Sequence, residues 1–124
     1  MHSILTLRKR LLYCLVMSLF AGTAMAGQVT LSGEQIIEYL SGRSIEGNQD
    51  GMHWEQSFDA SGLTTYVQNR SRPSAGRWKA IDDRYCSQWP PSNRWDCYDF
   101  TAEGDELTFI PVSGGQPWLA RRLP

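Results

Sequence analysis

The chain has 124 residues and a formal net charge of −1 at pH 7. A chain of this length accommodates one small domain. The charge argues against a nucleic-acid partner, because nucleic-acid phosphates require a basic face.

The first 26 residues have the three parts of a secretory signal peptide. Arg8 to Arg10 form a basic start, residues 11–20 are an apolar run, and Ala24-Met25-Ala26 is a small-x-small cleavage pattern. The apolar run is shorter than the roughly 20 residues that cross a bilayer as a helix. The sequence therefore predicts an exported mature protein, residues 27–124, that is periplasmic or secreted and keeps no stable membrane anchor.

Removal of this leader would change both the charge and the cysteine count. Three of the 12 Lys and Arg residues leave with it and none of the 13 Asp and Glu residues, which gives the mature chain a net charge of −4. Cys14 also leaves, so that Cys86 and Cys97 remain. An even number of cysteines in an exported domain predicts one disulfide between these two residues.

One helix is predicted near the start of the mature chain, between Ser32 and Gly42. Ser32 and Gln35 have the spacing of a capping box, in which each side chain binds a backbone N–H of the other residue. Ile36, Ile37 and Leu40 then form one apolar stripe. A helix this short is not stable alone, so we expect it to pack on another part of the domain.

The rest of the chain reads as short strands separated by turn residues. The expected strands are 43–46, 52–58, 63–69, 76–81, 84–89, 95–101, 106–112 and 116–121. Turn sequences recur about every ten residues, which is typical of an all-β meander, and connections this short make neighbouring strands antiparallel. We therefore predict a mainly β domain with an antiparallel meander of seven or eight strands, either a curved sheet or a small barrel, and the helix packed across it.

The cysteines also predict the register of one hairpin. If Cys86 and Cys97 face each other, three further pairs lie opposite one another: Tyr85 with Tyr98, Arg84 with Asp99, and Gln88 with Trp95. An aromatic pair and an opposite-charge pair in these positions stabilise a sheet. Pro90 and Pro91 then fall in the loop, where a missing backbone donor has no cost.

Several short motifs of this chain occur in the order found in a known group of proteins. They are the helix end at 40–47, the hairpin residues 58–62, Gly76-Arg77-Trp78, Tyr85-Cys86-Ser87-Gln88-Trp89 and Asp96-Cys97-Tyr98. In this pattern the chain resembles small exported proteobacterial domains of unknown function that have a Gly-x-Trp strand and a Cys-x-x-Trp…Cys-Tyr hairpin. The resemblance implies a compact antiparallel sheet or barrel with one disulfide, and it implies no catalytic residues.

Candidate residues for catalysis or metal binding are few. His53 is the one histidine in residues 27–124, and its sequence context supplies neither a nucleophile nor an orienting carboxylate. His53, Cys86 and Cys97 lack the spacing of metal ligands. There is also no glycine-rich phosphate loop. We therefore predict no catalytic residue, no metal and no cofactor.

The mature chain is rich in tryptophan, and these rings are the best candidates for binding. Trp54 and Trp78 fall inside strands, where we expect them in the core, whereas Trp89 and Trp95 flank the Pro90-Pro91 loop. Trp and Tyr offer large rigid surfaces for contacts. We predict that Tyr85, Trp89, Trp95 and Tyr98 line a ligand-binding patch. The alternative is that all these rings pack in the core.

These observations favour an exported, non-enzymatic binding or inhibitor-like module whose ligand is an unknown protein or small molecule. One alternative is a small periplasmic hydrolase or isomerase that uses His53 with Glu55, two residues away on the same face of a strand. The other alternative is a structural domain that helps to assemble a larger envelope complex.

Overall fold

The fold was analysed in a computed structural model of the protein, which describes residues 27–124. The predicted signal peptide, residues 1–26, lies outside the described residues. Within the described part of the chain, no helix has the length and apolarity needed to span a membrane.

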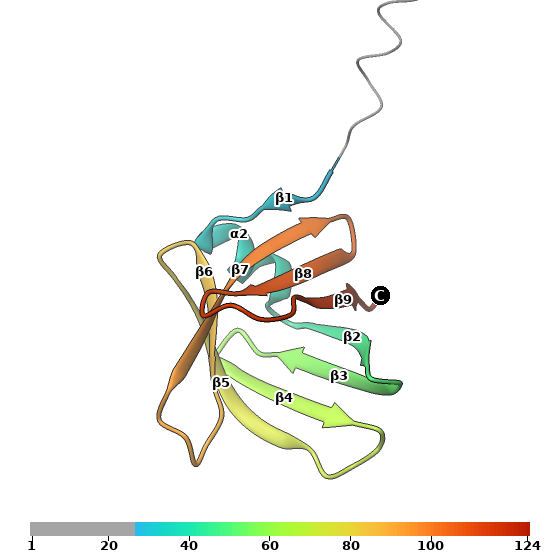
Figure 1. Ribbon diagram of the computed structural model, residues 1–124. Coiled ribbons are helices and arrows are strands. Elements are labelled where there is room, and N and C mark those ends of the chain that lie inside the picture. Colours follow the sequence, from blue (N-terminus) through green and yellow to red (C-terminus); the bar gives the residue numbers. More distant parts are fainter. Residues whose placement is uncertain (1–26) are drawn as a thin grey trace, which may run out of the picture.

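Eight antiparallel strands, β2 to β9, close into a barrel (Figure 1). Each strand pairs with the next along the chain, and β9 also pairs with β2, which closes the ring. The structure has the following elements: β1 Val29–Thr30, α2 Gly33–Leu40, β2 Arg43–Gln49, β3 Met52–Phe58, β4 Leu63–Gln68, β5 Ser74–Ile81, β6 Arg84–Gln88, β7 Trp95–Glu103, β8 Glu106–Pro111 and β9 Trp118–Arg122.

The eight predicted strands are all present. Of the two predicted forms, a curved sheet or a small barrel, the structure has the closed barrel. One further strand was not predicted: β1 pairs through two residues with the part of β7 that β6 leaves free. The strand at 43–46 is also longer than expected and runs to Gln49. Its turn is tighter than predicted because Asp50 and Gly51 both have positive φ angles, 50° and 77°, which suit a two-residue hairpin turn.

Helix α2 begins at the predicted cap and packs against β5, β6 and β2. The hydroxyl of Ser32 accepts a hydrogen bond from the Gln35 N–H (3.3 Å), and the Gln35 amide oxygen accepts one from the Ser32 N–H (2.9 Å). A tertiary contact adds to this cap, because the Asp83 carboxylate in the β5–β6 turn accepts a hydrogen bond from the Gly33 N–H. The helix is thereby tied to a turn 50 residues away in sequence.

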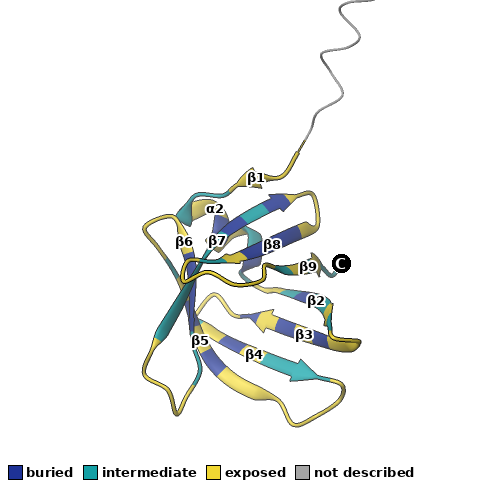
Figure 2. Ribbon diagram, viewed as in Figure 1, coloured by how far each residue is buried: buried dark blue, intermediate teal, exposed yellow. Residues whose placement is uncertain are grey.

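The barrel interior is filled at the end where α2 packs. Inward and outward side chains alternate along β3 and β5, as Figure 2 shows by its alternation of dark blue and yellow. The core combines residues from the helix with residues from most of the strands: Ile36, Leu40, Ile45, Trp54, Phe58, Trp78, Tyr85, Phe100, Ala102, Leu107 and Phe109. Trp54 and Trp78 are among them, as predicted.

The β6–β7 hairpin has the predicted register. Cys86 and Cys97 are paired and joined by a disulfide, with Cα atoms 4.1 Å apart. The predicted pairs of Tyr85 with Tyr98 and of Gln88 with Trp95 are also formed. Outside the regular ladder, the Arg84 guanidinium lies 3.2 Å from the Asp99 carboxylate.

Candidate functional site

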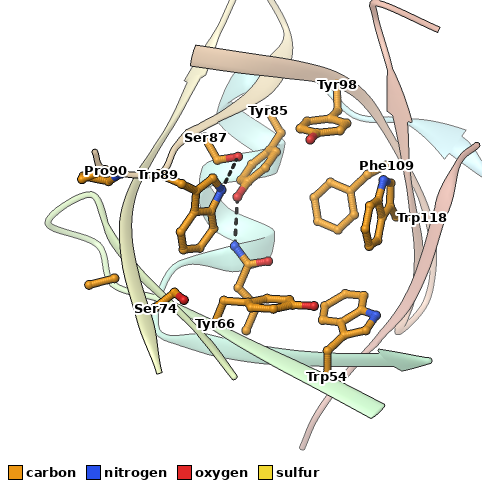
Figure 3. Close-up of a pocket in the computed structure, with 12 residues that line it drawn as sticks. Trp54, Tyr66, Ser74, Tyr85, Ser87, Trp89, Pro90, Tyr98, Phe109 and Trp118 are labelled. Atoms are coloured by element: carbon orange, nitrogen blue, oxygen red, sulfur yellow. Dashed lines mark hydrogen bonds between the residues drawn. The ribbon is translucent and has the colours of Figure 1, made fainter. Parts of the chain in front are cut away.

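At the end of the barrel away from α2, the interior is hollow. A cavity of about 530 Å³ opens there, and side chains from β3 to β9 surround it (Figure 3). Its lining is mainly aromatic: Trp54, Gln56, Tyr66, Ser74, Ala75, Tyr85, Ser87, Trp89, Pro90, Tyr98, Phe109 and Trp118. The cavity is thus built by the closed barrel as a whole and not by any one hairpin.

Two of these tryptophans lie flat against the wall because a glycine stands opposite each of them. Gly47 of β2 pairs with Trp54, and a Cβ at position 47 would lie 2.5 Å from the Trp54 ring. Gly76 of β5 stands in the same relation to Trp89, with a Cβ-to-ring distance of 2.6 Å. Each indole therefore occupies the space where the opposite side chain would stand. This arrangement keeps both rings at the wall and leaves the centre of the barrel open.

The rings contact one another around the cavity. Trp54 stacks on Tyr66, with ring centroids 5.8 Å apart and an interplanar angle of 28°. Trp54 also meets Trp118 edge to face, and Tyr66 meets Trp89 in the same manner. Such pairs add to the stability that burial alone provides. Tyr85, Tyr98 and Phe109 form a second group of contacting rings in the cavity wall, as Figure 3 shows.

Gln56, Tyr85 and Ser87 supply polar groups to the cavity. The Gln56 amide nitrogen donates hydrogen bonds to the Thr64 hydroxyl (2.9 Å) and to the Tyr85 hydroxyl (3.2 Å). The Trp89 indole N–H donates to the Ser87 hydroxyl (3.3 Å). Gln56 and Tyr85 are 8% and 3% exposed, so these contacts are made inside the barrel.

None of the described residues that line this cavity carries a charge at neutral pH. Burial raises the pKa of Tyr66, Tyr85 and Tyr98 above the ordinary value of 10.0 for tyrosine. For Tyr98 the negative charge of Asp96 acts in the same direction. All three phenols are therefore uncharged at neutral pH. The cavity favours uncharged, largely apolar ligands, because a charged group would lose its hydration without gaining an opposite charge.

The structure brings three of the four predicted ligand-binding residues together at this cavity. Tyr85, Trp89 and Tyr98 line it. Trp95 lies on the other face of the β6–β7 hairpin, because its partner in the ladder is Gln88 and not an inward residue. There the Lys79 ammonium lies 4.0 Å from the centre of the Trp95 ring. Trp95 is thus part of the outer surface of the barrel.

Sequence reasoning missed the part of the wall that other strands supply. Trp54 was expected to be buried, and it is, but its role in the cavity was not foreseen. Tyr66, Phe109, Trp118 and the amide of Gln56 were not singled out as site residues. A usable signal was present: in a two-residue-turn hairpin, Gly47 falls opposite Trp54, and a glycine opposite an inward tryptophan marks a ring laid against the backbone.

Comparison of the chain with protein-family models, with curated proteins and with solved structures found no match. The resemblance to small exported proteobacterial domains therefore stays a prediction.

A second, outward-facing groove of about 510 Å³ contains His53. The His53 Nε2 atom lies 3.1 Å from the Glu46 carboxylate, and the ligand atoms of Glu46, His53 and Glu55 lie within 4.8 Å of one another. Imidazole and carboxylate are donors that could hold a divalent cation. All three side chains lie on the outer face of β2 and β3, where solvent reaches them.

The chemistry available to this groove is limited by its other residues. Among the described residues that line it there is no Ser, Thr, Tyr or Cys side chain. His53 therefore has no hydroxyl or thiol side chain in this groove to activate. The predicted neighbour Glu55 is close to His53, but the nearer partner is Glu46 from the adjacent strand.

Proposed function

We propose that this protein is a non-enzymatic binding module that holds a small, uncharged, ring-containing ligand in the aromatic cavity of its barrel. The observation that carries this proposal is the open centre between rings laid against the wall. Large side chains surround the cavity and do not fill it, because Trp54 and Trp89 lie over Gly47 and Gly76. A glycine inside a strand costs stability, and in return these two keep space free inside the barrel.

The size and chemistry of the cavity support the same proposal. Its volume of about 530 Å³ lies within the range of small-molecule sites, roughly 300 to 1,000 Å³. Such sites combine apolar walls with a few polar groups that orient the ligand, and here Gln56, Tyr85 and Ser87 are such groups. The absence of charge among the described lining residues argues for a neutral ligand.

We further propose that the protein acts outside the cytoplasm, in the periplasm or as a secreted protein. The signal-peptide pattern in residues 1–26 and the Cys86–Cys97 disulfide support this location, because disulfides persist mainly in oxidising compartments. Intact mass of the protein recovered from the extracytoplasmic fraction tests it. A mass that corresponds to residues 27–124 with both thiols oxidised is expected, and an unprocessed chain with free thiols would overturn it.

The binding function can be tested with a neutral fluorescent probe, N-phenyl-1-naphthylamine, and its anionic relative 8-anilinonaphthalene-1-sulfonate. One molecule of the neutral probe is expected to bind per protein chain. Its binding should quench tryptophan emission, because tryptophans line the cavity. The sulfonate should bind at least about tenfold more weakly, because its charge must be desolvated. Equal binding of both probes, or none, would contradict the proposal.

Two matched variants decide whether the probe binds in the cavity. Ser74 lies at its mouth, and Ser74→Trp places a large ring there. Thr65 lies one residue from Tyr66 and faces outward, so Thr65→Trp adds the same ring to the outer surface. Ser74→Trp should abolish probe binding and Thr65→Trp should leave it unchanged. The proposal fails if both variants bind the probe like the unmodified protein.

A further inference from the structure

Within the aromatic cavity, Gln56 and Tyr85 form a polar pair whose orientation the surrounding hydrogen bonds determine. The Thr64 hydroxyl donates its proton to the backbone oxygen of Ser57 (2.8 Å). Thr64 must therefore accept, and not donate, in its contact with Gln56. This requires the nitrogen of the Gln56 amide, and not its oxygen, to face Thr64.

The same amide nitrogen gives its second proton to the Tyr85 oxygen, at 3.2 Å. Both amide protons of Gln56 are then used, and the Tyr85 oxygen acts as an acceptor. Two hydrogen-bonding groups of the pair remain: the carbonyl oxygen of Gln56 is an acceptor, and the hydroxyl proton of Tyr85 can be donated. No hydrogen bond among residues 27–124 uses the carbonyl oxygen of Gln56. Tyr85 has the Ser87 hydroxyl as a second hydrogen-bond partner. This contact lowers the pKa of Tyr85, as a donor to the phenol oxygen does, so Ser87 donates and the Tyr85 proton stays available.

The two unused groups are open to the cavity. Gln56 and Tyr85 both line it, and the one fully buried side-chain atom without a partner in the described chain is the hydroxyl of Ser41, elsewhere. The carbonyl oxygen of Gln56 is therefore reachable from the cavity. An acceptor and a donor thus stand side by side on a surface that is mainly aromatic.

Resting on the binding function proposed above, we infer that the ligand is a flat, uncharged ring with a lactam edge, an N–H next to a C=O. Its N–H would donate to the Gln56 oxygen and its C=O would accept from Tyr85, while the ring lies against the aromatic wall. Such an edge matches both unused groups at once. A sugar ring fits less well, because its hydroxyl groups point in all directions and most would lose their hydration without a partner here.

Three related probes that differ at this edge test the inference: 2-quinolone, N-methyl-2-quinolone and quinoline. The first has both groups of the lactam, the second lacks the N–H, and the third lacks the N–H and the C=O. Binding is measured by tryptophan quenching and by calorimetry. 2-Quinolone should bind about tenfold more tightly than N-methyl-2-quinolone, because loss of the N–H leaves the Gln56 oxygen covered and unpaired.

A pair of tyrosine variants assigns the effect to the proposed contact. Tyr85→Phe removes the donor and keeps the ring, whereas Tyr39→Phe removes a hydroxyl outside the cavity, which donates a hydrogen bond to the backbone oxygen of Gly104. Tyr85→Phe should weaken 2-quinolone binding about tenfold. Tyr39→Phe should leave 2-quinolone binding unchanged. Binding of N-phenyl-1-naphthylamine to each variant reports whether the cavity is intact.

The outcomes separate this inference from the proposed function. If the three quinoline-type probes bind equally, or if glucose binds more tightly than 2-quinolone, the lactam inference is wrong while the binding cavity remains. If no probe binds, including N-phenyl-1-naphthylamine, both proposals fail. Should Tyr85→Phe fail to fold, the comparison of the three probes on the unmodified protein still decides the question.

Discussion

The replacement of Gly76 by alanine tests the idea that a glycine keeps the Trp89 ring against the wall. A Cβ at position 76 would lie 2.6 Å and 2.9 Å from two atoms of the Trp89 ring and 2.7 Å from the backbone oxygen of Gln88. Real Cβ atoms essentially never approach this closely, so the ring or the strand has to move. Overpacking of this kind costs about 1–3 kcal/mol.

A smaller effect acts in the opposite direction. Alanine restricts the unfolded chain more than glycine, which stabilises the folded state by about 0.4–1 kcal/mol. The net expectation for Gly76→Ala is therefore a loss on the order of 1–2 kcal/mol in the free energy of unfolding. The displaced ring should also narrow the cavity and weaken binding of the neutral naphthylamine probe.

Urea denaturation followed by circular dichroism measures the change in stability, with Gly33→Ala as the control. At position 33 the added Cβ would make ordinary contacts, the closest being 3.5 Å from the Asp83 carboxylate. Because this residue is the first of α2, Gly33→Ala should be neutral or stabilise by up to about 1 kcal/mol. Probe binding should stay unchanged in the control.

A double-mutant cycle shows whether the cost comes from the ring. In a Trp89→Ala background the ring clash is absent, and the cost of Gly76→Ala should fall by on the order of 1 kcal/mol. The same cost in both backgrounds would refute the view that Gly76 is needed to make room for the Trp89 ring.

Three further predictions concern other parts of the barrel. Burial raises the pKa of Tyr85 above 10.0, so the unfolded chain loses this proton at a lower pH than the folded chain. The free energy of unfolding should therefore fall as pH rises above 10, by up to about 1.4 kcal/mol per pH unit for one proton. Tyr85→Phe should make this fall less steep in urea titrations, and an equally steep fall in the variant would contradict the prediction. Replacing both Cys86 and Cys97, which are 11 residues apart, by serine should lower the free energy of unfolding by on the order of 3 kcal/mol, measured by urea denaturation. A loss below about 1 kcal/mol would be inconsistent with stabilisation by loop-closure entropy. His53→Ala should change the free energy of unfolding by less than about 1 kcal/mol, because its contact with Glu46 is exposed to solvent. A larger loss in thermal unfolding would show that His53 contributes to the stability of the fold.

The local elements were predictable because their causes lie close together in sequence. Ser32 and Gln35 are three residues apart and form the expected cap of α2. Cys86 and Cys97 are joined by a short loop, so one pairing sets the register of the whole β6–β7 hairpin. In each case a few neighbouring residues hold all the information needed.

The cavity could not be predicted in the same way. Trp54 and Trp118 meet edge to face, although they are 64 positions apart and lie on strands that are not neighbours in the sheet. Only closure of β9 onto β2 brings their faces together. The error on Trp95 had a different cause, because Trp95 lies three residues from Tyr98 along β7 and side chains at an odd spacing in a strand point to opposite faces. The predicted register therefore already placed Trp95 on the outer face of the hairpin.

The sequence by itself determined the strands, the helix cap, the disulfide pairing and the abundance of aromatic rings, because these depend on periodicity, turn residues and short-range pairing. Tertiary structure decided that the sheet closes, that one end of the barrel is filled by α2 while the other stays hollow, and that Gln56 and Tyr85 keep an unused acceptor and donor inside. The physical reason is that a cavity is a property of surfaces that face each other. Residues distant in sequence acquire such facing partners only when the ring of strands is complete.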